Sequence, residues 1–121
     1  MLNKIKIIQV AGTPSNREVA GIEYDSRKVV EGSVFVAIKG FNTDGHLFIQ
    51  DALNKKAIAV VLENYEAVPD SFVDHFNAVK ILVNNSREAL AELSNIYYDE
   101  PYKKMRLIGI TGTNGKTTTS Y

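Results

Sequence analysis

The sequence predicts an α/β fold, a small layered domain with a mainly parallel or mixed sheet and flanking helices. Three apolar runs, rich in β-branched residues, lie at positions 34–38, 57–62 and 79–83. Their length and composition are those of central strands that are covered on both faces. Helical patterns follow the first and the last of these runs. Strands that alternate with helices are typical of layered α/β domains.

One further strand is predicted before the first central one. Residues 18–24 alternate as a half-buried strand does, with Ile22 and Tyr24 on one face and Glu23 on the other. Ahead of it, residues 1–10 are compatible with either a strand or a short helix.

A helix is predicted after the loop at 39–46, and Asp44 could cap it. An amphipathic pattern divides this helix into an apolar inner face and a polar outer face. The inner face would carry Leu47, Phe48, Ala52 and Leu53, and the outer face Gln50, Asp51, Lys55 and Lys56.

The last predicted helix begins after the third central strand. Asn85 with Glu88 three residues later resembles a capping box. Apolar residues then recur at helical spacing, namely Leu90, Leu93, Ile96 and Tyr97. Pro101 would stop the helix. We therefore expect one domain at 1–101 and the start of a second at 102–121.

The composition of the chain narrows the classes of function that it could have. The chain has 121 residues and a formal net charge of +0, from 14 basic and 14 acidic residues. This balance gives no indication of nucleic-acid or membrane binding. There are no cysteines, which excludes disulfides and thiolate chemistry. No apolar run approaches the roughly 18 residues that span a bilayer. We expect a cytoplasmic monomer that is not inserted in a membrane.

The stretch after the last helix has the residues of a phosphate-binding loop. Residues 107–110 read as a buried strand, and Gly112 and Gly115 allow the turns that point successive N–H groups at one anion. Lys116 would stabilise the outer phosphates, and the Thr117 hydroxyl would bind magnesium. The predicted ATP-binding residues are Gly112, Thr113, Asn114, Gly115, Lys116, Thr117 and Thr118.

This loop departs from the common P-loop spacing, because Ile110 stands five positions before Gly115 where a glycine is usual. The sequence ends at Tyr121, barely one helical turn later. Because a helix that short is marginal alone, we expect a longer parent protein, and we expect this fragment to be inactive by itself.

Several stretches together resemble the front part of the Mur ligases, which extend the peptide of the cell-wall precursor. They are YDSR at 24–27, GSVFVA at 32–37, Gly40, DGH at 44–46, YYDEP at 97–101 and GITGTNGKTTT at 109–119. The last is similar to the ATP loop of that family, whose glycine spacing is shortened in the same way. The likeness is greater to the branch that adds the third amino acid, usually meso-diaminopimelate or lysine, than to the branch that adds D-alanyl-D-alanine.

The resemblance implies ATP- and Mg²⁺-dependent amide formation through an acyl phosphate, on UDP-N-acetylmuramoyl-L-Ala-D-Glu. It implies that the first domain binds the UDP part of this substrate. The matching positions are Tyr24, Ser26, Phe41, Asn42 and Thr43. Tyr24 and Ser26 lie at the end of one predicted strand and Phe41 to Thr43 at the end of the next, where open α/β sheets usually bind ligands.

Plainer interpretations compete at several polar residues. Arg27 could hold a diphosphate or pair with Asp25, Asp44 suits a helix cap, and His46 suits a packed side chain better than a ligand contact. His75 has no motif around it. Two other functions also remain open, a small autonomous P-loop module of the kinase or GTPase type, and a non-catalytic interaction domain with a vestigial loop.

Overall fold

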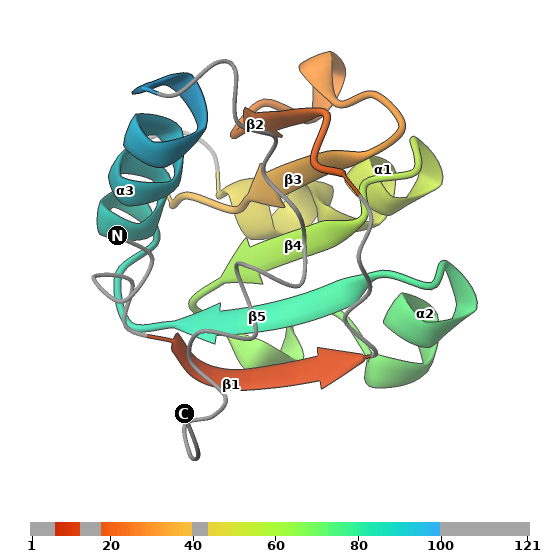
Figure 1. The fold of residues 1–121 in the computed structure, drawn as a ribbon. Coiled ribbons are helices and arrows are strands. Elements are labelled where there is room, and N and C mark those ends of the chain that lie inside the picture. The colour runs from red at the N-terminus through yellow and green to blue at the C-terminus, as the bar shows by residue number, and fades with distance from the viewer. Residues whose placement is uncertain (1–6, 13–17, 40–43, 100–121) are drawn as a thin grey trace, which may run out of the picture.

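The computed structural model describes residues 7–12, 18–39 and 44–99. These residues contain a five-stranded sheet in the order β1-β5-β4-β3-β2 (Figure 1). Its strands are β1 (Ile7–Gly12), β2 (Gly21–Glu23), β3 (Ser33–Val36), β4 (Ala59–Leu62) and β5 (Val79–Val83). β2 to β5 are mutually parallel, and β1 lies antiparallel to β5. The predicted α/β fold with a mainly parallel or mixed sheet is confirmed.

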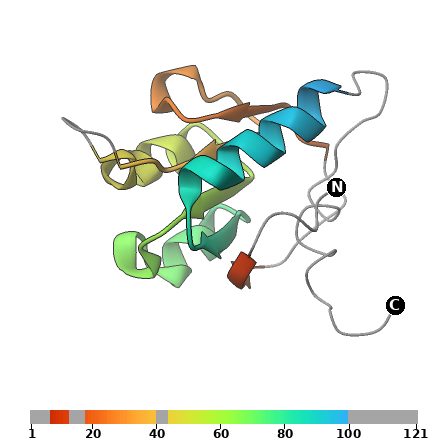
Figure 2. The same cartoon turned by 90° about the vertical axis from the view of Figure 1, so that its left-hand side faces the viewer.

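Helices cover both faces of the sheet. α3 (Ser86–Asp99) lies on one face, and α1 (Ile49–Asn54) and α2 (Asp70–His75) lie on the other (Figures 1 and 2). Short 3-10 helices connect the larger elements, namely η2 (Ser26–Lys28), η3 (Gly45–Phe48) and η4 (Tyr65–Ala67). The described chain therefore has three layers, with the sheet in the middle.

The alternation of side chains along the central strands builds two cores. Val34 and Val36 of β3 belong to the core on the α3 side, together with Leu93. Phe35, between them, belongs to the core on the opposite side, together with Leu53 of α1. All five are 1% exposed or less, and burial of such a side chain contributes about 1.5–3 kcal/mol. The three predicted central strands are the three interior strands of the sheet.

The strand predicted at 18–24 is shorter than expected. Ile22 is buried as predicted, but Tyr24 is 63% exposed and does not share its face. The reason is that β2 ends at Glu23 and the chain then turns into η2, so the alternation stops before Tyr24.

The inner face predicted for the helix after Asp44 is correct for Ala52 and Leu53 but wrong for Leu47 and Phe48. Leu47 is 76% exposed and Phe48 is 39% exposed, whereas Ile49 is buried. Residues 45–48 form a 3-10 helix with about three residues per turn, so the phase of the α-helical pattern does not extend through them.

The predicted cap of the last helix is confirmed. Asn85 Oδ1 accepts a hydrogen bond from Glu88 N at 3.0 Å. Leu93 is buried, and Leu90 and Tyr97 pack against the α3-side core. The domain boundary predicted near Pro101 lies outside the described residues.

Candidate functional site

A pocket of about 480 Å³ lies at the edge of the sheet where the parallel strands β2 and β3 end. This carboxyl edge is where open α/β sheets usually bind ligands. η3 closes the pocket on its other side. The lining residues are Tyr24, Asp25, Ser26, Arg27, Ile38, Gly45 and Phe48. The predicted site residues Tyr24 and Ser26 thus lie together in one pocket.

The turn after β2 is fixed by Asp25. Its carboxylate caps η2 by accepting a hydrogen bond from Arg27 N at 3.0 Å, and it binds Arg27 Nε at 3.1 Å and Nη2 at 3.0 Å. The side-chain hydrogen bond from Arg27, helped by the backbone one, lowers the pKa of Asp25 to about 2, and Asp25 in turn raises the pKa of Arg27. The ion pair with Asp25, one of the alternatives left open for Arg27, is therefore present in the structure. It leaves the 86% exposed guanidinium of Arg27 at the pocket rim.

Ser26 is the buried polar residue of the pocket, at 7% exposure. Its carbonyl accepts hydrogen bonds from Lys55 Nζ at 2.9 Å and from Val29 N at 3.3 Å. Its hydroxyl has no hydrogen-bond partner among the residues that the structure describes. This group is therefore available to a polar atom that enters the pocket.

Gly45 allows η3 to approach the end of β3 closely. A Cβ atom at this position would lie 2.6 Å from Ile38 N and 2.9 Å from Ile38 O. The Gly45 N–H instead donates to Ile38 O at 2.8 Å, and Lys39 and Asp44 form an antiparallel bridge beside it. This hydrogen bond is part of that single bridge, so the two segments form a minimal ladder, in which Ile38 and Gly45 line the pocket.

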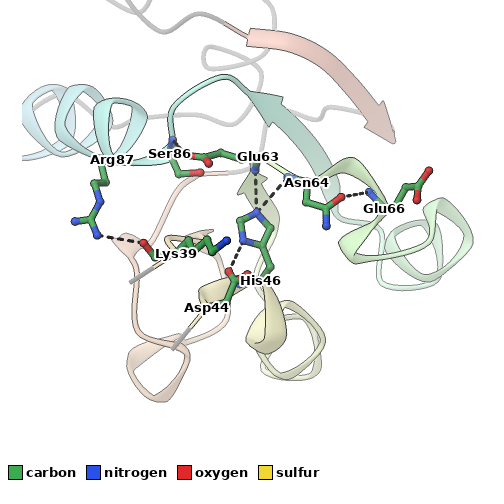
Figure 3. Close-up of polar contacts among 8 residues, drawn as sticks. All are labelled: Lys39, Asp44, His46, Glu63, Asn64, Glu66, Ser86 and Arg87. Carbon is green, nitrogen blue, oxygen red and sulfur yellow. Dashed lines mark hydrogen bonds and ion pairs between the residues drawn. The ribbon is translucent and has the colours of Figure 1, made fainter. Parts of the chain in front are cut away.

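His46 is packed and does not line the pocket. Its side chain is 8% exposed, and its Nδ1 lies 2.7 Å from Asp44 Oδ1 (Figure 3). Its Nε2 accepts hydrogen bonds from Glu63 N at 3.0 Å and Asn64 N at 3.2 Å. Because backbone N–H groups can only donate, the ring proton resides on Nδ1 and points at Asp44. The hydrogen bond from His46 N, chiefly, lowers the pKa of Asp44, which caps η3 as predicted.

The beginning of α3 reaches the same edge of the sheet. Glu63 Oε2 accepts a hydrogen bond from Ser86 N at 2.6 Å, and Arg87 Nη2 donates to Lys39 O at 3.2 Å (Figure 3). Sequence reasoning missed these contacts and that of Lys55, because their partners lie 23, 48 and 29 positions away and no motif links them.

Other predicted site residues lie outside the described part of the chain. They are Phe41, Asn42, Thr43, Gly112, Thr113, Asn114, Gly115, Lys116, Thr117 and Thr118. Within residues 7–12, 18–39 and 44–99, no group of three or more His, Cys, Asp or Glu side chains could hold a metal ion. None of the helices described is long and apolar enough to cross a membrane.

Residues 18–98 match the profile of the "Mur ligase family, catalytic domain". The chain belongs to the Mur ligase family. The resemblance found in the sequence is therefore confirmed, and the pocket described above lies within the matched part of this Mur ligase.

Two curated relatives illustrate the similarity. The chain is 43% identical over 119 residues to the UDP-N-acetylmuramoyl-L-alanyl-D-glutamate–2,6-diaminopimelate ligase of Cytophaga hutchinsonii, covering 98% of this chain and 24% of that protein. It is 44% identical over 108 residues to the UDP-N-acetylmuramyl-tripeptide synthetase of Roseiflexus sp., covering 89% of this chain and 20% of that protein. The chain thus spans a quarter or less of the length of these relatives.

Solved structures of the family also match the fold. The MurF ligase from Thermotoga maritima, solved in complex with ADP, superposes with a TM-score of 0.51 and 34% identity, over 65% of this chain and 17% of that one. MurF from Acinetobacter baumannii gives a TM-score of 0.50 and 25% identity, over 62% and 15% of the two chains.

Proposed function

We propose that this chain is the front part of an ATP-dependent Mur ligase that adds the third amino acid to UDP-N-acetylmuramoyl-L-Ala-D-Glu in peptidoglycan biosynthesis. The described domain binds the UDP part of that substrate in the pocket at the ends of β2 and β3. The observation that carries this proposal is a pocket at the carboxyl edge of the sheet that brings together Tyr24, Ser26 and Arg27, with the Ser26 hydroxyl unpaired among the described residues. The names of the relatives in the previous subsection support the choice of substrate.

The chemistry of the pocket suits a nucleoside diphosphate. Tyr24 and Phe48 offer aromatic surface to a base, and Ser26 offers a hydroxyl to its polar edge or to the ribose. Arg27 offers guanidinium N–H groups beyond those that bind Asp25, and these suit phosphate oxygens. The carboxylate of Asp25 is neutralised by this pairing, so it repels an anionic ligand less.

Phe41, Asn42 and Thr43 complete the proposed site. Their neighbours Lys39 and Asp44 pair in the ladder beside the pocket. An aromatic face, an amide and a hydroxyl suit a uracil and a diphosphate, as the family resemblance implies for these three residues.

ATP and Mg²⁺ belong to the second part of the proposal. The donor set of residues 112–118 suits a nucleotide triphosphate, with Lys116 at the outer phosphates and the Thr117 hydroxyl at the magnesium. Bound ATP supplies the phosphoryl group that activates the substrate carboxylate as an acyl phosphate. We assign 1–101 to the UDP-binding domain and 102–121 to the start of the ATPase domain of a cytoplasmic, monomeric enzyme.

Calorimetry of the chain with UDP-N-acetylmuramoyl dipeptide and with UDP tests the binding proposal. We expect saturable heat and a rise in melting temperature with both ligands, and neither with inorganic pyrophosphate at equal concentration. Absence of heat and of any melting shift at millimolar UDP would contradict the assignment of the pocket.

A second candidate is the D-alanyl-D-alanine-adding branch of the family, because the solved structures that match are MurF ligases. The sequence identity of 43–44% to the first two relatives, against 34% for the Thermotoga maritima MurF, favours the first candidate. An activity assay of the complete ligase separates the two candidates. The enzyme is incubated with ATP and either the dipeptide precursor plus diaminopimelate or lysine, or the tripeptide precursor plus D-alanyl-D-alanine. Mass spectrometry then shows which peptide is extended.

A further inference from the structure

One wall of the pocket is a short ladder between the segments that contain Ile38 and Gly45, and residues outside the pocket hold this ladder in place. Ile38 and Gly45 line the pocket and are joined by the 2.8 Å hydrogen bond from Gly45 N to Ile38 O. That hydrogen bond belongs to the isolated antiparallel bridge between Lys39 and Asp44, the next residue along each segment. A ladder this short is marginal by itself, so its position depends on what holds its two segments.

His46 holds the Asp44 end. Its buried ring spans from Asp44 Oδ1 to the backbone N–H groups of Glu63 and Asn64, which directly follow β4 (Figure 3). Both ring nitrogens are used, and the side chain has little room to take another position at 8% exposure. The ladder is thereby attached to the end of a central strand.

Arg87 holds the Lys39 end. From the first turn of α3, its Nη2 donates to Lys39 O at 3.2 Å. That turn is itself attached to the sheet, because Glu63 Oε2 binds Ser86 N at 2.6 Å (Figure 3). Contacts from the end of β4 and from α3 therefore fix the two segments of one pocket wall, and Glu63 takes part in both.

We propose that His46 and Arg87 are positioning residues for nucleotide binding, which hold the Ile38–Gly45 wall in the geometry that the ligand requires. This inference rests on the proposed function of the pocket. Neither side chain lines the pocket, so neither needs to touch the ligand. A wall that is ordered before binding spares the ligand the entropic cost of ordering it, and affinity depends on this preorganisation. Loss of either contact frees one end of the ladder and weakens binding without removing a ligand contact.

Substitutions that break and then restore each contact test the inference. His46→Leu removes both polar functions of the ring, whereas His46→Gln retains one acceptor for a backbone N–H group and one donor for Asp44. Arg87→Ala removes the contact to Lys39 O, and Arg87→Lys keeps a donor and the charge. His75→Leu is the matched control, because His75 is exposed and does not line this pocket. Affinity for UDP is measured by calorimetry, and melting temperature is measured in parallel.

The loss of one hydrogen bond, at about 0.5–1.5 kcal/mol, corresponds to roughly a 2- to 12-fold weaker Kd. We expect the affinity for UDP to fall within this range in Arg87→Ala and by its upper end in His46→Leu. At least half of the lost binding free energy should be recovered in His46→Gln and Arg87→Lys. The affinity of His75→Leu should not change. Ligand-detected NMR with uridine, which is uncharged, separates positioning from charge. Positioning weakens uridine and UDP by the same factor, whereas loss of the Arg87 charge weakens UDP alone.

The outcomes are distinguishable. If the unaltered chain does not bind UDP, the proposed function fails and the inference fails with it. If it binds UDP and folded Arg87→Ala binds within twofold, or loses affinity for UDP but not for uridine, the positioning role of Arg87 is wrong while the function of the pocket stands. The same comparison of folded His46→Leu decides the role of His46. If His46→Leu does not fold, the inference is decided by two other results. One is the affinity of His46→Gln for UDP compared with that of His75→Leu, and the other is the affinity of Arg87→Ala.

Discussion

At the scale of single residues, two buried serines show how differently the same side chain can be used. Ser33 is 0% exposed, and its Oγ accepts a hydrogen bond from Val30 N at 3.1 Å. Ser26 is 7% exposed, lines the pocket, and its hydroxyl has no partner among the described residues. The first hydroxyl stabilises the turn before β3, whereas the second is left for a ligand.

This contrast predicts opposite effects of two equivalent substitutions. Ser26→Ala should weaken UDP binding roughly 2- to 12-fold, since one hydrogen bond is worth about 0.5–1.5 kcal/mol, and should leave the melting temperature nearly unchanged. Ser33→Ala should lower the free energy of unfolding by about 1–3 kcal/mol, because Val30 N is left unpaired, and should not change the Kd of the folded protein. Calorimetry and urea denaturation measure the two quantities, and a reversed pattern would contradict the assignment of Ser26.

Phe48 and Leu47 form a second pair of this kind. Both are exposed and lie in η3, but Phe48 lines the pocket and Leu47 does not. Base–aromatic stacking is worth about 1–3 kcal/mol on alanine substitution. Phe48→Ala should therefore weaken UDP binding roughly 5-fold or more, Phe48→Tyr should retain it, and Leu47→Ala should leave it unchanged in the same titration. An equal loss in Phe48→Ala and Leu47→Ala would show that the effect arises from η3 as a whole.

Of the seven described residues that line this pocket, two were expected as binding positions. Tyr24 and Ser26 were expected from the family resemblance, and both lie in it. Phe48 and Ile38 were not predicted, because both read as core positions in an apolar pattern. The 3-10 geometry of η3 turns Phe48 toward the pocket, and no periodicity rule applied to the sequence distinguishes it from a continuing α-helix.

At the scale of elements, carboxylates hold the short connecting helices in place. Asp25 caps η2 and Asp44 caps η3, each through a backbone N–H two residues later. The pKa of both groups is lowered, for Asp25 first by the side-chain hydrogen bond from Arg27 and for Asp44 first by the backbone N–H of His46. The turns that form the pocket therefore depend on ionised aspartates.

This dependence predicts a loss of stability in acid. The pKa of Asp25 is about 2 in the folded chain and has an ordinary value of 3.8, so its ionised form is favoured by folding. Its contribution is fully present above about pH 4 and is lost as the pH falls toward about 2. Asp25→Asn should show a smaller decrease of the urea midpoint between pH 4 and pH 2 than the unaltered chain. A carboxyl NMR titration with a midpoint near 3.8 for Asp25 would contradict the prediction.

The side chain of Lys80 connects β5 to η4 and to the start of α2. It is 1% exposed, and its Nζ donates to Val68 O and to Asp70 Oδ1 and lies 3.6 Å from the centre of the Tyr65 ring. Lys80→Ala should lower the free energy of unfolding by about 2–5 kcal/mol, because it leaves Val68 O unpaired and creates a cavity. Lys80→Met keeps the aliphatic stem and should cost less than half as much in urea denaturation. An equal cost for the two variants would contradict this and show that the polar contacts dominate.

The central elements were predictable and the connecting ones less so. The interior strands β3, β4 and β5 are covered on both faces, so their sequences are continuous apolar runs. α2 has only six residues, too few for a helical period to repeat in the sequence. Lys80 interrupts an apolar strand, and only the fold shows that its charge is paired.

At the scale of the whole described chain, the order of the strands could not be predicted from local pattern. β1 was left as strand or helix, and it forms the antiparallel edge beside β5. Its burial does not alternate, because Ile8 and Gln9 are both exposed and Val10 and Ala11 are both partly buried, so no period of two is seen. Its pairing is decided by contacts with residues 79–83, about seventy positions later.

The pocket is likewise a property of the whole fold, which yields the last prediction. Its residues come from three separate stretches, 24–27, Ile38 and 45–48, and only folding brings them together. A ligand that binds this assembled pocket and not the unfolded chain stabilises the fold by RT ln(1 + [L]/Kd), about 2.7 kcal/mol at a hundredfold excess over Kd. Urea denaturation at increasing UDP should therefore show a free energy of unfolding that rises by about 1.4 kcal/mol per tenfold of ligand, with an unchanged m-value. The slope should vanish with inorganic pyrophosphate, which lacks the base and ribose. Calorimetric binding of UDP without this increase in stability would mean that the ligand binds a segment that does not need the fold, and would rule out the pocket between β2 and η3 as its site.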